Sequence, residues 1–324
     1  MALSYSLRML CLIAVSTGLI QIAVEALLWM SAPCILRFLD DLPVRARERM
    51  LYLVHVAPCG LALLFTFFFC LPRYIADETN FASENIGWLC ILVAIAIALW
   101  WTMSVFAGLR MALRTMRFTR ACRRDAQRLA YPSEPVPVLA FAGMARWVAL
   151  VGLMRPFILI SKSLIEEVGL HPLALEVVLD HERSHAAQGD NWKLLSLHCL
   201  PRLRLKLPGG STWMDAWQNI AEWAADDDAV RGDRNRAFTL AQTLVTLSRY
   251  TTERTQVVMT ALLCKEAQLA SRVERLIQSE PTPRTSARPY VALLLGSAIV
   301  SIVTFLVAFT PWLRDLPEQI LQLR

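Results

Sequence analysis

The chain has 324 residues, of which 56% are hydrophobic and only 19% are charged, and its formal net charge is +6. A mean hydropathy of +0.43 is too high for a pair of ordinary soluble domains and is typical of a membrane protein. The arginines lie beside apolar runs, as in loops that face an anionic leaflet, so we expect the lipid bilayer as a partner and no direct nucleic acid binding.

Eight cysteines are distributed singly along the chain, and no C-x-x-C pair occurs. Several of them lie in or beside apolar stretches. The pattern therefore predicts neither a disulfide framework nor a thiolate zinc site.

Four apolar stretches are long enough to cross a bilayer as helices, at about residues 9–30, 50–71, 87–109 and 290–309. The first is too long, and too poorly followed by a small-residue cleavage site, to be a removable signal peptide. It contains Glu25, which is costly in lipid, so we expect this residue near the end of its helix or against another helix.

A fifth apolar region, at 136–160, is interpreted as a pair of buried strands. It contains Arg146 and Arg155, each of which opposes insertion at a helix centre by about 2.5–3.5 kcal/mol, and also Pro156. An edge strand in this region could bind an extended substrate through main-chain hydrogen bonds.

The arginines also predict the orientation, because basic residues are retained on the cytoplasmic side. Four arginines lie between the first two spans and seven follow the third, whereas Arg73 is the one arginine between the second and third. Both termini are therefore expected outside the inner (plasma) membrane. The predicted division is a membrane domain at 1–114, a cytoplasmic domain at 115–288, and the fourth span with a short extracytoplasmic tail at 289–324, after a Pro-rich linker at 281–289.

The segment His181-Glu182-Arg183-Ser184-His185 follows Pro172, which suits the first turn of a helix. Residues four apart share a helix face, so His181 and His185 can present two imidazole nitrogens to one metal ion. Glu182 adjoins the first of them, where its carboxylate can exchange a proton with a metal-bound water. Chance occurrence of this pentad would leave two ordinary helix-surface histidines.

A second helix is predicted to begin near Thr212, which forms a capping-box pattern with Asp215, and to end before Gly232. Along it, Glu222 and Asp226 are four residues apart and point the same way. Glu222 can be the third ligand, and Asp226 can accept a hydrogen bond from the far nitrogen of a ligand histidine. The two aspartates that follow are expected on the solvated face.

These elements resemble the BlaR/MecR-type membrane metallopeptidases, which belong with the gluzincins, and more distantly the HtpX and CAAX-type proteases. The resemblance rests on the pentad with Asp190 five residues after it, and on Glu222-x-x-Ala225-Asp226. Weaker similarities are Gly152-x-x-Arg155-Pro156 and Arg272-Val273-Glu274-Arg275-Leu276.

The resemblance implies a mainly α protein with four transmembrane helices and a cytoplasmic zincin-like α+β domain between the third and fourth. It implies Zn²⁺ held by His181, His185 and Glu222, with Glu182 as general base and acid and with Asp226 and Asp190 beside the ligands. The oxyanion-stabilising residue stays open among Arg202, Arg204, Tyr250 and His198. The better-known receptors carry a penicillin-binding sensor after the last span, and direct β-lactam sensing is not expected of a chain that ends at Arg324.

Three hypotheses about function follow. The first is a signalling protease that cleaves a cytoplasmic or membrane-proximal protein such as a transcriptional repressor. The second is a quality-control protease for membrane proteins, and the third is a transmembrane transducer that keeps the fold without turnover. Homo-oligomerisation is compatible with all three.

Overall fold

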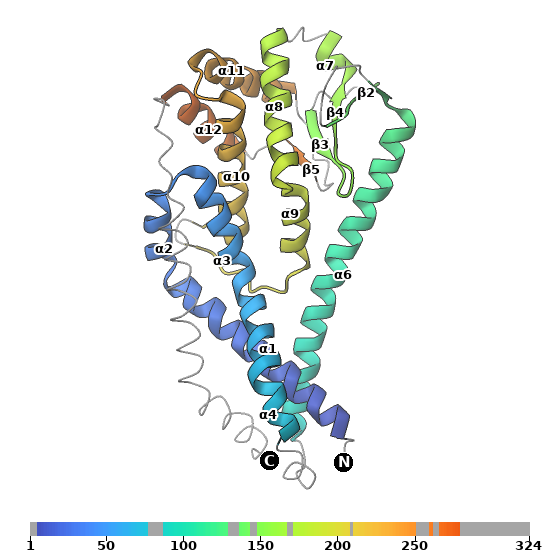
Figure 1. Cartoon of the computed structure of the whole chain (residues 1–324), viewed down its shortest axis with the longest axis vertical. Helices are drawn as coiled ribbons and strands as arrows, with labels where there is room; N and C mark the ends of the chain where they lie inside the picture. The colour runs from blue at the N-terminus through green and yellow to red at the C-terminus, as the bar shows by residue number, and fades with distance from the viewer. Residues whose placement is uncertain are drawn as a thin grey trace. The chain divides into compact units, whose positions relative to one another are not determined.

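A computed structural model of the chain describes residues 5–76, 87–128, 136–142, 148–166, 171–207, 210–250, 259–261 and 266–278. These residues are mostly helical and include one small sheet (Figure 1). The mainly helical class is therefore confirmed. The fourth span at 290–309, the linker before it and the tail after it lie outside the described residues, as does Arg146.

The helical elements are α1 (Tyr5–Met30), α2 (Ala32–Asp40), α3 (Val44–Phe65), the π-helix η1 (Thr66–Cys70), α4 (Leu71–Ala76), α6 (Trp88–Asp125), α7 (Lys162–Glu166), α8 (Pro172–Gln188), α9 (Asp190–Cys199), α10 (Trp213–Val230), α11 (Arg234–Tyr250) and α12 (Glu266–Gln278). The strands are β1 (Gln127–Arg128), β2 (Val138–Phe141), β3 (Val148–Val151), β4 (Phe157–Ser161) and β5 (Met259–Ala261).

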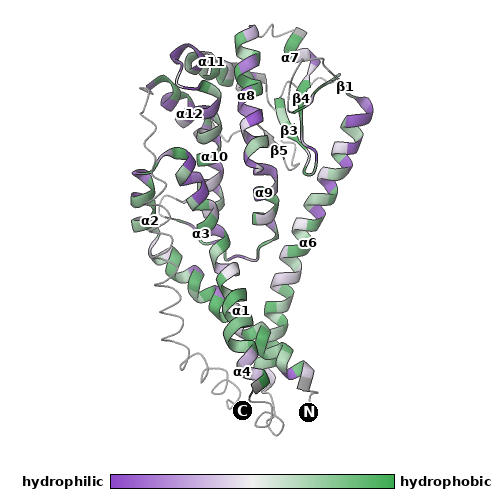
Figure 2. Cartoon of the chain, viewed as in Figure 1, coloured by the Kyte–Doolittle hydropathy of each residue, from purple (hydrophilic) through white to green (hydrophobic). Residues whose placement is uncertain are grey.

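Among the residues that the structure describes, three helical stretches are long and apolar enough to cross a membrane, at Ser6–Met30, Val44–Cys70 and Trp88–Asp125. The first three stretches predicted as spans are therefore helices of sufficient length and hydropathy, with longer bounds than predicted. The third continues far beyond residue 109, because its arginine-rich end has no helix breaker and keeps the helical hydrogen bonding to Asp125. Figure 2 shows the change along α6, from a hydrophobic first half to a largely hydrophilic end.

The described residues form two compact units, which we describe separately. One contains the chain up to Val105 together with Leu200–Trp213. The other contains Phe106–Cys199 and the chain from Met214 onward through α12. The second unit contains the sheet and the predicted metal-binding residues.

In the first unit, one polar face of α1 binds the segment that joins α9 to α10. Gln21, Glu25 and Trp29 are spaced four residues apart and so lie on one face of the helix. The Gln21 amide donates to the carbonyl of Pro201 at 2.5 Å, the backbone N–H of Leu203 donates to Glu25 at 2.8 Å, and the Trp29 indole donates to the carbonyl of Lys206 at 2.8 Å. Glu25 thus lies near the end of its helix, as expected, and its partner is a loop.

In the second unit, the strands are ordered β1-β2-β4-β3-β5, with β2 and β4 parallel and the other neighbours antiparallel. The region predicted as a pair of strands therefore contains three. Gly152 has φ +102°, and a Cβ there would lie 3.2 Å from the carbonyl oxygen of Arg155. This glycine permits the tight turn to Pro156 that divides the apolar run into β3 and β4.

Helix α8 packs between the sheet and α11 in the second unit (Figure 1). Its apolar residues join Ile158 and Ile160 of β4 in one core, to which α11 and α12 also contribute. Because α8 is covered on both sides, the polar residues of the pentad other than Arg183 are buried as well. Buried polar groups need partners, and the contacts of these residues define the site.

Candidate metal centre

The pentad lies in the last turns of α8, and local sequence sets both ends of this helix. His171 caps the first turn by accepting from the N–H of Leu173, and Pro172 occupies the first helical position. Gly189 has φ +66° and ends the helix in the left-handed conformation, which a glycine adopts without strain. The predicted start of α8 at Pro172 is confirmed.

The two histidines of the pentad turn their Nε2 atoms toward each other. The Nε2 atoms of His181 and His185 are 3.1 Å apart, and both side chains are almost completely buried. The rings meet nearly edge to face, with 4.8 Å between their centroids. The helical spacing therefore brings them together as predicted.

Glu222 of α10 completes a group of three side chains. One carboxylate oxygen lies 3.4 Å from Nε2 of His181, and the other lies 3.5 Å from Nε2 of His185. One ligand atom from each of the three residues lies within 4.8 Å of the others, so the group could hold a metal ion. The side chain of Glu222 is 13% exposed, whereas the side chains of the two histidines are at most 1% exposed. Glu222 therefore lies on the more accessible side of the group.

Each histidine also contacts a carboxylate through its far nitrogen. Nδ1 of His181 lies 3.0 Å from Oδ1 of Asp226, and Nδ1 of His185 lies 2.8 Å from Oδ2 of Asp190. An ionised carboxylate only accepts hydrogen bonds, so the neutral ring of His185 carries its hydrogen on Nδ1, whereas the contact of His181 with Asp226 is a close ion pair without hydrogen-bond geometry. Nε2 of His185 is then a lone-pair donor that faces Nε2 of His181 and the carboxylate of Glu222.

This donor set fits a cation. Two imidazole nitrogens 3.1 Å apart need a proton or a metal ion between them, and two imidazoles with one carboxylate are common transition-metal ligands. The pKa of His181 points the same way. Burial alone would lower it, but the contacts with Asp226 and Glu222 raise it to about 9. The surroundings of the group therefore favour a positive charge.

Arg272 of α12 is a component of the site to which the sequence alone assigned no role. Its side chain is fully buried, and its guanidinium lies 2.6–2.8 Å from Asp226 through two nitrogens and 2.7 Å from Glu222 through the third. Burial would raise the pKa of both carboxyl groups, but Arg272 and the histidines hold each below its usual range. Both acids are therefore ionised at neutral pH.

A signal for Arg272 is present in the sequence. Leu269, Val273 and Leu276 recur at helical spacing and pack against the core, and Arg272 lies on the same face of α12. An arginine within an apolar helix face needs a buried anionic partner. Which acid would meet it could not be read from spacing alone.

Glu182 lies between α8 and the sheet and is fully buried. Its Oε2 accepts from the backbone N–H of Leu150 in β3 at 2.7 Å, whereas Oε1 has no hydrogen-bond partner among the described residues. Burial raises the pKa of Glu182 to about 7, although the neighbouring histidines lower it. The carboxyl group is held by one oxygen, and the other remains available.

Asp180 precedes the pentad and anchors this end of α8 to the neighbouring elements. It accepts hydrogen bonds from Arg183, from Arg231 at the end of α10 and from Arg236 of α11. Arg236 also donates to the carbonyl of Ala229. This network is a structural support that the sequence analysis did not identify, because its members come from three separate helices.

The expected solvated face of α10 is present. Asp227 and Asp228 are exposed, and they pair with Arg275 and Ser184 respectively. Of the candidate oxyanion residues, Arg202 donates to the carbonyl of His55, and Nδ1 of His198 lies 2.8 Å from the carbonyl oxygen of Leu194. The side chain of Tyr250 lies outside the described residues.

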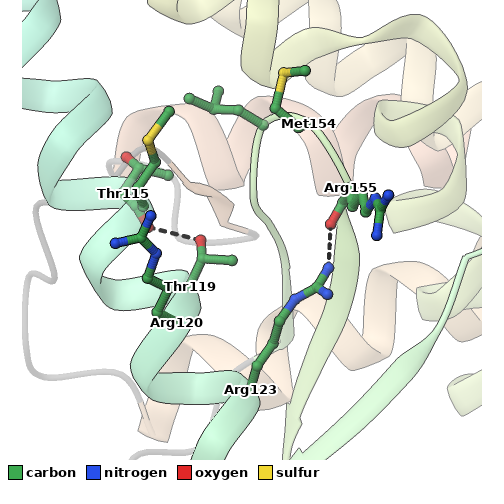
Figure 3. Close-up of a pocket in the computed structure, with 8 residues that line it drawn as sticks. Thr115, Thr119, Arg120, Arg123, Met154 and Arg155 are labelled. Carbon is green, nitrogen blue, oxygen red and sulfur yellow. Dashed lines mark hydrogen bonds between the residues drawn. The ribbon is translucent and has the colours of Figure 1, made fainter.

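A groove of about 290 Å³ lies between α6 and the turn that joins β3 to β4 (Figure 3). Its lining includes Thr115, Thr119, Arg120 and Arg123 of α6 with Met154 and Arg155 of the turn. Arg123 donates to the carbonyl of Arg155 and lies over the ring of Phe157. Among the described residues, no lining side chain has a buried polar atom without a partner, so the groove is explained by packing of α6 on the turn.

No protein-family model matches the chain, and no curated protein sequence matches it significantly.

Proposed function

We propose that the chain is an integral-membrane zinc metalloendopeptidase. The observation that carries this proposal is the buried group of His181, His185 and Glu222 beside Glu182, in a chain with three candidate membrane-spanning helices. Two histidines and a carboxylate are a known ligand set of catalytic zinc. Bound there, Zn²⁺ would acidify a water molecule and polarise the carbonyl of a peptide bond.

The chain's own residues supply the remaining chemistry. Because Leu150 holds Oε2 of Glu182, the carboxylate is oriented, and Oε1 can take a proton from water and return it to the nitrogen of the leaving amine. Water oxygen then adds to the carbonyl carbon and the C–N bond breaks, which leaves a carboxylate and an amine. Asp190 keeps the hydrogen of the His185 ring on Nδ1, and the ionised Asp226 lies 3.0 Å from Nδ1 of His181.

The biological role that we propose is regulated proteolysis, with a cytoplasmic or membrane-proximal protein such as a transcriptional repressor as substrate. The arginine bias supports a cytoplasmic position of the site and extracytoplasmic termini. The resemblance of the two motif elements to the BlaR/MecR-type peptidases supports a signalling role.

Replacement of Glu182 by glutamine tests the proposal. E182Q keeps the size of the side chain and removes the proton acceptor, so the rate of peptide hydrolysis should fall by about 10² to 10⁴ with zinc still bound. The purified chain would be incubated with membrane and cytosolic extracts, with cleavages identified by mass spectrometry and zinc measured in parallel. E176Q is the matched control, since Glu176 is exposed on the same helix and pairs with Arg236.

Wild-type hydrolysis by E182Q would contradict the mechanism. The glutamine variant also serves as a substrate trap. Capture of one protein supports regulated proteolysis, whereas capture of many membrane proteins would replace it by quality control. A zinc-loaded wild-type chain that cleaves nothing would favour the transducer.

A further inference from the structure

The side chain of Arg272 is fully buried, which is rare for an arginine. It contacts two acids of the candidate site. Nε and Nη2 bind the two oxygens of Asp226 at 2.8 and 2.6 Å, and Nη1 lies 2.7 Å from Oε2 of Glu222. A planar guanidinium has the donors to make all three contacts at once, whereas a lysine ammonium is a point charge.

Arg272 pairs with one of the two carboxylate oxygens of Glu222. Oε2 lies 2.7 Å from Nη1 of Arg272 and 3.4 Å from Nε2 of His181, whereas Oε1 lies 3.5 Å from Nε2 of His185. Arg272 also shares Oδ1 of Asp226 with Nδ1 of His181. One side chain therefore contacts the proposed third ligand and the residue that orients the first.

We propose that Arg272 is a positioning residue that leaves Glu222 a single oxygen, Oε1, for the metal ion and locks Asp226 against His181. This inference rests on the proposed zinc site. A ligand that binds through one oxygen occupies one coordination position, so a position stays open for water or substrate. Arg272 acts through Glu222 and Asp226, and no contact of its own with substrate is implied.

A purely structural role would tie α12 to α10 through the same ion pairs without any effect on the ion. The two roles differ in what a lysine does. R272K keeps the positive charge but cannot bind Asp226 through two nitrogens and Glu222 at the same time. A positioning role therefore predicts weaker and altered metal binding in R272K, beyond any change in stability.

The experiment uses the full-length chain in detergent, with zinc affinity measured by competition against a chelator and with the absorption spectrum of the Co²⁺-substituted protein. R272K should bind zinc about 10- to 100-fold more weakly than wild type and show a changed cobalt spectrum. R275K is the matched control, because Arg275 is on the same helix and pairs with the exposed Asp227. It should match wild type in both measurements.

Wild-type zinc affinity and an unchanged cobalt spectrum in R272K would overturn the inference and leave the proposed function intact. A wild-type chain that binds no stoichiometric zinc would overturn the proposed function itself. If R272K does not fold, the structure of the zinc-loaded wild type decides. Oε1 alone on the ion, with Arg272 on Oε2, supports the inference, and both oxygens on the ion with Arg272 displaced overturns it.

Discussion

At the scale of single residues, each histidine of the candidate centre contacts an aspartate, and each aspartate pairs with a different basic residue. Asp190 binds His185 and is paired with Lys193 at 2.9 Å, whereas Asp226 binds His181 and is paired with the buried Arg272. A carboxylate behind an imidazole fixes its ring and makes its other nitrogen a better ligand. Both aspartates should therefore contribute to metal affinity.

Replacement of Asp190 by asparagine tests this contribution. The amide oxygen of D190N can still accept from Nδ1 of His185, but the negative charge is lost, so zinc affinity should fall by about tenfold. Chelator competition measures the change. Asp227→Asn is the control, because Asp227 is an exposed acid of α10. Equal zinc affinities for D190N and wild type would show that Asp190 only connects α9 to the end of α8 and does not contribute to metal binding.

The sequence predicts best those site residues that lie close together in the chain and share one helix face. His181 with His185, and Glu222 with Asp226, follow from helical spacing, so the sequence identified all four. Arg272 lies 46 residues from Asp226 in the chain, and its partner depends on how α12 packs, which no local pattern specifies. The same reason explains why the partners of Asp180, which lie on α11 and directly after α10, were missed.

At the scale of elements, α1 combines an apolar span with one polar face. The face binds backbone groups of residues 201–206, which are part of no helix or strand and would otherwise need other partners. Glu25 lies at the centre of this face and is almost fully buried. An acid that looked anomalous in the sequence is thus explained by a loop that is distant in the chain.

Glu25→Leu should destabilise the protein, because the N–H of Leu203 loses its acceptor. This hydrogen bond is part-buried, so its loss should cost about 0.5–1.5 kcal/mol, which would appear as a lower Tm in detergent. Glu25→Gln is the matched control, since its amide oxygen can still accept, and it should retain most of the stability. A Tm of the leucine variant equal to that of wild type would refute this role of Glu25.

The sheet shows which features of a fold a local sequence pattern does not predict. Apolar runs and Pro156 indicated buried strands, but the count of three depends on the turn at Gly152, and the parallel pairing of β2 with β4 depends on tertiary packing. Periodicity identifies a strand, whereas register and neighbours are set by contacts across the fold.

At the scale of the whole molecule, the chain crosses repeatedly between its two compact units. Helix α6 contributes Trp88–Val105 to the first and Phe106–Asp125 to the second, and Leu200–Trp213 belongs to the first although α9 and α10 belong to the second. The unit that carries the candidate centre is therefore discontinuous in sequence. Asp190 on α9 and Glu222 on α10 are joined through a segment that binds α1.

The central claim is that His181, His185 and Glu222 form a zinc site, and the zinc content of the purified chain tests it most directly. His185→Ala removes one ligand, whereas the control His198→Ala removes a histidine of α9 whose Nδ1 lies 2.8 Å from a backbone carbonyl oxygen. Elemental analysis should find about one zinc per chain in wild type and in H198A, and almost none in H185A. Absence of zinc from wild type, or equal content in wild type and H185A, would contradict the claim.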